Sequence, residues 1–132
     1  MNNGMTLSIV VVEDSRFYAD LIVRILKRSG LNVRSKVVSS MTALYKTLNE
    51  DKWDIILSDN VMPEFSALGA LNVKNEICSK TPFFIISEDI SQKELDEAFE
   101  NGCDFYLPKD KIEELPDQIK IALNINGDKI CR

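Results

Sequence analysis

Short apolar runs, mostly of β-branched and aromatic residues, recur along this chain, and each is followed by a stretch with the spacing of an amphipathic helix. The runs lie at Leu7 to Val12, Asn32 to Val38 (a weaker one), Asp54 to Ser58, Pro82 to Ile86 and Cys103 to Leu107. Runs this short and this apolar favour strands that are buried on both faces. Their alternation with helices predicts an α/β fold with a doubly wound, five-stranded parallel sheet and five helices.

The helices have recognisable starts and stops. They are expected at Ser15 to Ser29, after Ser39 or Ser40, at Ser66 to Cys78, after Ser91, and at Lys111 to Asn124. Asp14 or Ser15 is the expected N-cap of the first helix, and Gly30 and Gly102 are expected to stop the first and fourth. Ser91 and Glu94 have the spacing of a capping box.

Two further features concern the first and last helices. The apolar face of the first is predicted to comprise Phe17, Leu21, Ile22, Ile25 and Leu26. In the last helix, a proline at position 116 predicts either a restarted first turn or a kink, because proline cannot donate a backbone hydrogen bond.

Length and charge limit the possible functions. The 132 residues fit one domain, expected at residues 1–124, with residues 125–132 as a polar tail or the start of a linker. The net charge is -5, which argues against direct binding of nucleic acid. The chain has no histidine, which excludes a Ser-His-Asp triad, a histidine-bound zinc and a phosphohistidine within these residues.

The cysteines and the hydropathy indicate the compartment. Cys78, Cys103 and Cys131 form no CxxC pair, and an odd number cannot pair fully within one chain. The longest apolar runs have about five residues, whereas a membrane span needs roughly 18. We therefore expect a cytoplasmic chain with free thiols and no membrane contact.

Polar residues that could carry chemistry stand directly after four of the five predicted strands. Glu13 and Asp14 follow the first, Asp59 the third, Ser87 the fourth and, two residues on, Lys109 the fifth. Each alone is commonplace as a helix cap, a turn residue or a surface charge. Together they fall at the edge where doubly wound sheets bind ligands. Three carboxylates and one ammonium there predict a Mg²⁺ site beside a carboxylate nucleophile that can form an aspartyl phosphate.

The motifs around these residues resemble a known family. VVEDS, SDNVMPEFSAL, IISE and FYLPKD occur in the order and spacing of the receiver domain of two-component response regulators, and the resemblance covers about Thr6 to Asn124. It implies a flavodoxin-like (CheY-like) fold with strand order 2-1-3-4-5. It also implies that Asp59 is the phosphoacceptor, with Lys109 and Ser87 as its catalytic partners.

The same resemblance implies a metal site and a switch. Mg²⁺ would be held by Asp14, Asp59 and the backbone carbonyl of Val61, with Glu13 acting mainly through water. Ser87 and Tyr106 would form the switch pair, and they would alter a face made of the fourth helix, fifth strand and fifth helix.

The implied function is signal transduction in a phosphorelay. A histidine kinase or phosphotransfer protein would donate the phosphoryl group, and the chain would catalyse only its own phosphorylation and dephosphorylation. The altered face would contact a second copy, forming a homodimer, or a downstream output domain.

Four departures from the family pattern stand out. Glu13 replaces the commoner aspartate, and Ser66 with Ala67 replaces a common Asp-Gly pair. Asp110 follows Lys109 where many receivers have proline, and Glu88 follows Ser87 where small residues are common. None of the four removes a required functional group.

Three other classes of protein share features with this sequence. A haloacid-dehalogenase-type phosphatase needs a second aspartate where this chain has Val61. An FMN carrier needs a phosphate-binding loop after Val12, which this sequence lacks. The serious rival is a pseudo-receiver, which uses the same fold as a phosphorylation-independent protein-interaction module.

Overall fold

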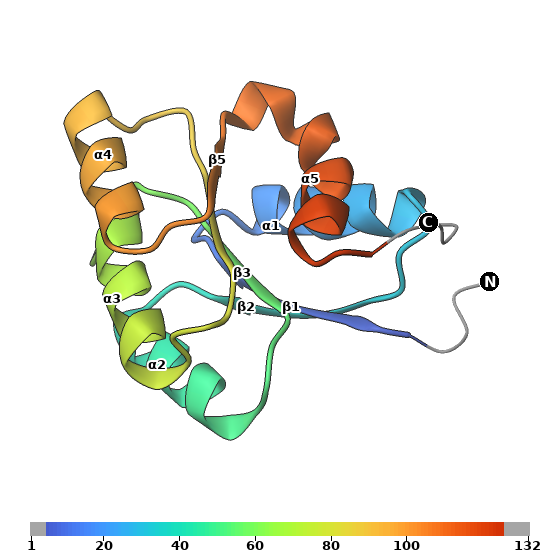
Figure 1. Ribbon diagram of the computed structural model, residues 1–132, viewed down its shortest axis with the longest axis horizontal. Coiled ribbons are helices and arrows are strands. Elements are labelled where there is room, and N and C mark those ends of the chain that lie inside the picture. The colour runs from blue at the N-terminus through green and yellow to red at the C-terminus, as the bar shows by residue number, and fades with distance from the viewer. Residues whose placement is uncertain (1–4, 126–132) are drawn as a thin grey trace.

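Five parallel strands form a single sheet in the computed structural model, which describes residues 5–125 (Figure 1). Their spatial order is β2-β1-β3-β4-β5, as the family resemblance implied. The strands are β1 (Leu7–Val12), β2 (Val33–Val38), β3 (Ile55–Ser58), β4 (Phe83–Ile86) and β5 (Phe105–Leu107). The tail predicted from residue 126 onward, including Cys131, lies outside the described residues.

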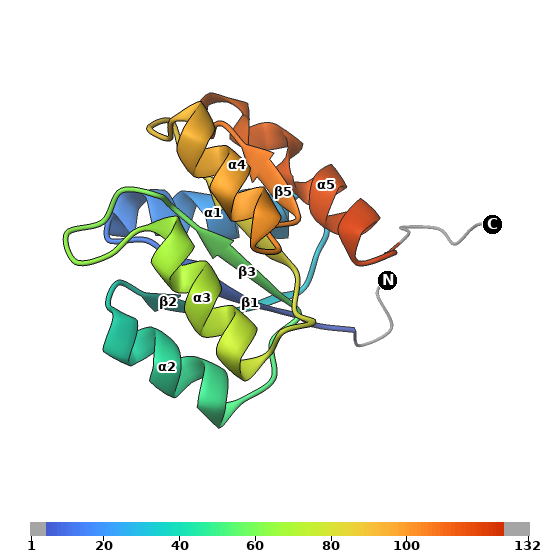
Figure 2. The same cartoon turned by 60° about the vertical axis from the view of Figure 1, so that its left-hand side comes forward.

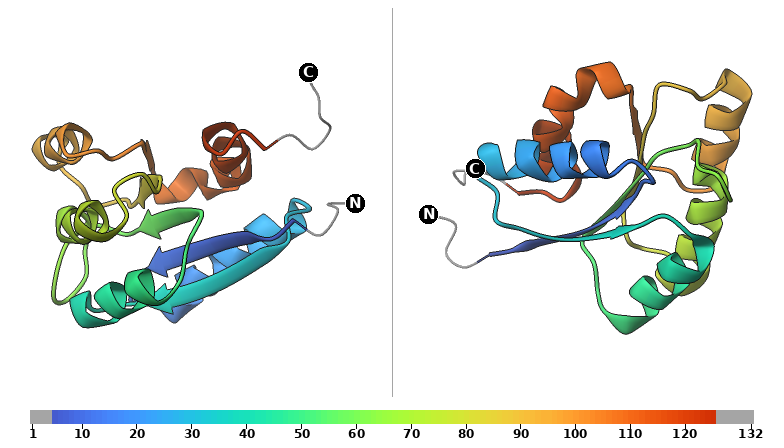
Figure 3. Two further views of the ribbon diagram at one scale, coloured as in Figure 1. Left: turned by 60° about the horizontal axis from the view of Figure 1, so that its bottom comes forward. Right: turned by 180° about the vertical axis from the view of Figure 1, so that it is seen from behind.

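Helices cover both faces of the sheet (Figures 1 and 2). They are α1 (Arg16–Arg28), α2 (Met41–Glu50), α3 (Ala67–Ile77), α4 (Gln92–Glu100), the 3₁₀ helix η1 (Lys109–Glu114) and α5 (Leu115–Ala122). The pair α1 and α5 packs on one face, and α2, α3 and α4 pack on the other. The arrowheads of β1 and β3 point the same way (Figure 3, left), so their carboxyl ends share one edge.

The core has two halves because side chains alternate along each strand. In β1, Ile9 and Val11 pack with α1 and α5, whereas Val10 and Val12 pack with α2, α3 and α4. All four are completely buried. A strand that is apolar at every position therefore has a structural reason, since both of its faces are covered.

Serine side chains begin four of the helices. Ser15, Ser40, Ser66 and Ser91 each accept a hydrogen bond from the backbone N–H three residues later. The capping box of Ser91 and Glu94 is present in full. These contacts decide in favour of Ser15 and Ser40 where the sequence had left two candidate caps open.

The prediction that the last helix begins at Lys111 was wrong. The chain from Lys109 to Glu114 forms η1, and α5 begins only at Leu115 with Pro116 in its first turn. A restarted first turn was one of the two predicted outcomes, and it suits proline because N–H groups in the first turn have no helical partner. Strands β2 to β5 also begin one or two residues later than predicted.

Phe17 is a second correction. The sequence placed it on the buried face of the first helix, but its side chain is 75% exposed. The buried stripe of α1 consists of Ala19, Ile22 and Leu26. Phe17 lies off this stripe because consecutive helical residues differ by about 100° in direction.

Among residues 5–125, no helix combines the length and apolar character needed to cross a bilayer.

The glycine after α4 gives a stability prediction. Gly102 has a φ of +104°, a conformation that L side chains rarely adopt, so Gly102→Ala should lower the free energy of unfolding by about 1 kcal/mol. Gly69 in α3 is the matched control, because an added Cβ would lie 3.5 Å from its nearest neighbours, an ordinary contact. Gly69→Ala should raise the free energy of unfolding by up to about 1 kcal/mol. Equilibrium unfolding in urea measures both, and equal effects would contradict the prediction.

Candidate functional site

Strand register brings the predicted site residues to one edge. Val12 of β1 is aligned with Ser58 of β3, so the residues that follow these two are neighbours. Ser58 is in turn aligned with Ile85, and Ile86 with Leu107. The five polar residues predicted from strand ends therefore gather at the carboxyl edge of the sheet: Glu13, Asp14, Asp59, Ser87 and Lys109.

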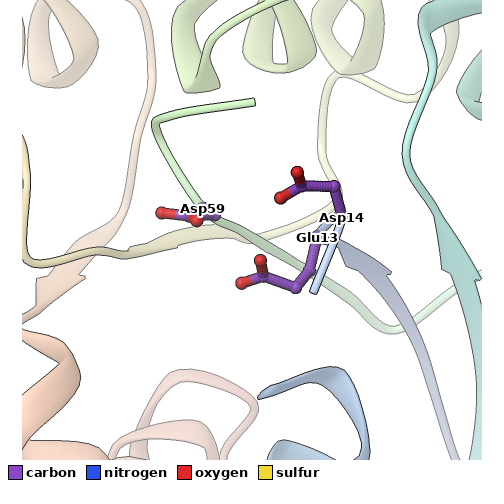
Figure 4. A group of neighbouring side chains, drawn as sticks. All are labelled: Glu13, Asp14 and Asp59. Carbon is purple, nitrogen blue, oxygen red and sulfur yellow. The ribbon is translucent and has the colours of Figure 1, made fainter. Parts of the chain in front are cut away.

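Three carboxyl groups meet beyond the ends of β1 and β3 (Figure 4). Glu13, Asp14 and Asp59 each offer an oxygen atom, and these three atoms all lie within 4.8 Å of one another. Glu13 is 3% exposed and Asp59 is 8% exposed, whereas Asp14 is exposed. Two of the three negative charges are thus largely removed from water.

Lys109 compensates part of this charge. Its Nζ atom lies 3.1 Å from Asp59 Oδ2 and 3.3 Å from Glu13 Oε1. Asp59 Oδ1 accepts a hydrogen bond of 2.7 Å from the backbone N–H of Asn60, and Glu13 Oε2 accepts one of 3.1 Å from that of Ser15. Each buried carboxylate therefore has one oxygen paired with the Lys109 ammonium and the other hydrogen-bonded to a backbone N–H.

Tyr18 is a member of the site that sequence reasoning missed. The Lys109 ammonium lies 4.2 Å from the centre of its ring, and its hydroxyl donates to the Lys109 backbone carbonyl over 3.3 Å. Such a cation–π contact holds the lysine from the side of α1. The only sequence signal was an aromatic residue in the first turn of the helix that follows the acidic pair.

The pKa values follow from burial and charge. Burial raises the pKa of Glu13 above its usual value, and the nearby Asp59 carboxylate adds to this, while the Ser15 N–H and Lys109 oppose it only in part. Burial alone would lower the pKa of Lys109. The hydrogen bond to Asp59 and the charges of Glu13 and Asp59 outweigh burial and raise it.

The carboxylate cluster fits a hard divalent cation. Its donors are all oxygen atoms, and the three negative charges exceed the single positive charge of Lys109. Magnesium prefers oxygen ligands of this kind and retains several water molecules. Because Asp14 is exposed, water can reach the cluster from its side. The residues that could hold the ion are Glu13, Asp14 and Asp59.

Ser87 and Tyr106 are in direct contact. The Tyr106 hydroxyl donates to the Ser87 backbone carbonyl over 3.0 Å, and the ring packs against the core on the α2–α4 face. Ser87 is 1% exposed, and its Oγ accepts a hydrogen bond from the backbone N–H of Asp89. The two predicted switch residues are thus linked, with the tyrosine turned inward.

Two of the departures from the family pattern have visible structural consequences. The longer side chain of Glu13 reaches both Lys109 and the Ser15 N–H. Ser66 acts as the N-cap of α3, so the loop after Asp59 enters the helix without glycine. Val61, whose backbone carbonyl was the predicted metal ligand, lies two residues beyond Asp59 and is 53% exposed.

Comparison with known proteins identifies the family. The family model described as "Response regulator receiver domain" matches residues 9–120, which is most of the chain and includes every residue of the site. The chain belongs to the family of response regulator receiver domains.

Curated relatives carry this domain within much longer chains. Hybrid signal transduction histidine kinase G of Dictyostelium discoideum is 28% identical over 106 residues, which is 78% of this chain and 3% of the relative. Transcription factor SKN7 of Saccharomyces cerevisiae is 27% identical over 112 residues, 82% of this chain and 18% of the relative. The chain thus spans only a small part of these proteins.

Solved structures share the fold at low identity. A CheY-like receiver domain protein from Methanospirillum hungatei has a TM-score of 0.81 at 17% identity, covering 91% of this chain and 95% of that one. The receiver domain of a sensor histidine kinase from Pseudomonas aeruginosa has a TM-score of 0.77 at 20% identity, covering 91% and 99%. That structure holds a magnesium ion coordinated in its active site cleft.

The carboxylate cluster predicts stabilisation by Mg²⁺. At 100 times its dissociation constant, the ion should raise the free energy of unfolding by about 2.7 kcal/mol. Asp14→Asn should abolish this gain, and it should raise the stability of the metal-free chain by relieving repulsion. Asp20→Asn, an exposed aspartate on α1, is the control and should keep the gain. Thermal unfolding with Mg²⁺ and with EDTA measures it, and a midpoint that Mg²⁺ leaves unmoved would rule out the site.

Proposed function

We propose that the chain is a phosphoacceptor receiver domain, which takes a phosphoryl group onto Asp59 from a histidine kinase or a phosphotransfer protein. The observation that carries this proposal is the contact between Asp59 Oδ2 and Lys109 Nζ at 3.1 Å, inside a cluster of two further carboxylates. A buried aspartate held beside a fixed ammonium suits a nucleophile whose product carries extra negative charge.

The transfer is a displacement at phosphorus. A carboxylate oxygen of Asp59 forms the new P–O bond while the P–N bond of a donor phosphohistidine breaks, and the electron pair of that bond leaves with the imidazole. Lys109 offsets the negative charge on the phosphoryl oxygens. Bound Mg²⁺ would supply further charge neutralisation at the same oxygens. The donor histidine must lie outside these 132 residues, because they contain none.

The chain would act on its own Asp59 and on no separate substrate. Hydrolysis of the aspartyl phosphate would return it to the resting state, so the phosphoryl group would serve as a signal. The curated relatives are a hybrid histidine kinase and two transcription factors. We infer that this receiver likewise serves a larger signalling system in the cytoplasm.

The face formed by α4, β5 and α5 would carry the output. Helix α4 has four exposed acidic residues and one exposed lysine: Glu94, Asp96, Glu97, Glu100 and Lys93. A two-fold homodimer that set α4 against its own copy would place like charges together. Of the two predicted partners for this face, an output domain with a basic surface is therefore favoured over a second copy.

Phosphorylation of Asp59 can be measured directly. Incubation with acetyl phosphate and Mg²⁺ should add one phosphoryl group to the intact chain, and peptide mapping should place it on Asp59. Asp59→Asn should lose the adduct, whereas Asp20→Asn should keep it. An undiminished adduct on Asp59→Asn would contradict the assignment. Failure of the wild-type chain to react would favour the phosphorylation-independent pseudo-receiver.

The Ser87–Tyr106 contact predicts a switch. The Ser87 hydroxyl accepts a hydrogen bond from the Asp89 N–H, and its own O–H can donate to a phosphoryl oxygen on Asp59. This new bond should draw Ser87 toward Asp59 and disturb the bond from Tyr106 to the Ser87 carbonyl. Beryllofluoride with Mg²⁺, a stable mimic of the phosphoryl group, should therefore shift the amide resonances of Ser87, Asp89 and Tyr106. Ser87→Ala should bind the mimic but reduce the shift at Tyr106. Shifts confined to the loop from Asp59 to Val61 would contradict the switch.

A further inference from the structure

Asn60, the residue after the proposed phosphoacceptor, makes side-chain contacts that no local sequence pattern predicts. The residue is buried, with 6% of its surface exposed. Its Nδ2 atom donates to the backbone carbonyl of Asp89 over 3.0 Å and lies 3.5 Å from Glu94 Oε2. Its Oδ1 atom accepts from the backbone N–H of Ala67 over 3.3 Å. One buried amide thus joins the start of α3, the loop after β4 and the first turn of α4.

These contacts require both functions of an amide. The carbonyl oxygen accepts from a backbone N–H, and the NH₂ group donates to two oxygens, which neither a carboxylate nor an apolar side chain of the same size could do. A buried polar group that satisfies several partners at once fixes their relative positions.

Asn60 also touches the phosphoacceptor itself. Its backbone N–H donates to Asp59 Oδ1 over 2.7 Å. A phosphoryl group on Asp59 changes the charge and the orientation of that carboxyl group, and hence the partner of this N–H. The change reaches the Asn60 side chain within a single residue.

Helix α4 is held to the core by few contacts, so a change at its first turn could shift it. Ala98 is its single fully buried residue, so few core contacts hold it in place. Its start is fixed by the capping box, in which Glu94 Oε1 accepts from the Ser91 N–H, while Glu94 Oε2 faces Asn60. A cavity of about 130 Å³ between α3 and α4 is lined in part by Asn60, Glu94 and Ala98. A small shift of α4 toward α3 would therefore meet little steric resistance.

We propose that Asn60 is a positioning residue that couples the Asp59 loop to the first turn of α4, by a route separate from Ser87 and Tyr106. This inference rests on the proposed function of Asp59. Modification of Asp59 moves the Asn60 backbone, the Asn60 amide changes its contacts with Asp89 and Glu94, and the start of α4 moves with them.

The test compares two variants with one control on the same helix. Asn60→Leu removes all three side-chain bonds. Glu94→Gln keeps an oxygen that can accept from the Ser91 N–H, as in the capping box. It presents an NH₂ group to the Asn60 NH₂ group, so it removes only the contact between Asn60 and residue 94. Glu100→Gln makes the same change of charge at an exposed position at the end of α4.

Amide chemical shifts of each chain are recorded with Mg²⁺, before and after addition of beryllofluoride. Both variants should bind the mimic and keep the wild-type shift at Tyr106, while their shifts in the first turn of α4 should be roughly twofold smaller than in the wild type. Glu100→Gln should match the wild type throughout. A variant that only lost stability would not keep the wild-type shift change at Tyr106 while losing part of the shift change in α4.

Two results would overturn the inference. If Glu94→Gln binds the mimic and its α4 shifts equal those of the wild type, Asn60 does not carry the coupling, and the proposed function stands. If the wild-type chain binds no beryllofluoride, both the proposed function and the coupling fail.

Discussion

Glu13 and Asp59 are carboxylates almost fully removed from solvent, and the fold must compensate their charge at the place where it holds them. An uncompensated buried charge costs several kcal/mol, and two close together would cost more. The ammonium of Lys109 lies within 3.3 Å of both, and backbone N–H groups satisfy the remaining oxygens. Once Asp14 is included, the three carboxylates exceed the single ammonium in charge, and this excess of negative charge makes the edge suited to a divalent cation.

Two features of the sheet place these groups together: the register of its strands, and the helices that cover both of its faces. Parallel pairing of β1 with β3 places their last residues side by side, and the short β5 brings Lys109 to the same level. Helices cover both faces of the sheet, so polar side chains gather at its two ends, and the site residues are those at the carboxyl edge. The core thus fixes the position of the carboxylate cluster, whereas α4 contributes only one fully buried residue, Ala98, and would be the element that moves in the proposed response.

Two of the residues that depart from the family pattern make contacts of their own that suit their new positions. Glu13 uses its added length to reach Lys109 and the Ser15 N–H. Ser66 accepts a hydrogen bond from the Gly69 N–H and so caps the start of α3, at the place where an Asp-Gly pair is common in the family. After Lys109 the chain continues directly into the turns of η1, so Asp110 lies exposed in a 3₁₀ helix.

The sequence alone determined the strand order through its resemblance, the two-sided burial of the strands, and the set of polar residues at their ends. These properties are local or periodic: an apolar run shows burial on both faces, and its last residue marks the edge. Tertiary structure decided the rest. The exposure of Phe17 depends on how α1 is rotated against the sheet, which apolar spacing alone did not resolve. The contacts of Tyr18 with Lys109 and of Asn60 with Glu94 join positions 91 and 34 residues apart. No local pattern marks such pairs, because only the packing of complete elements brings the two side chains within reach of each other.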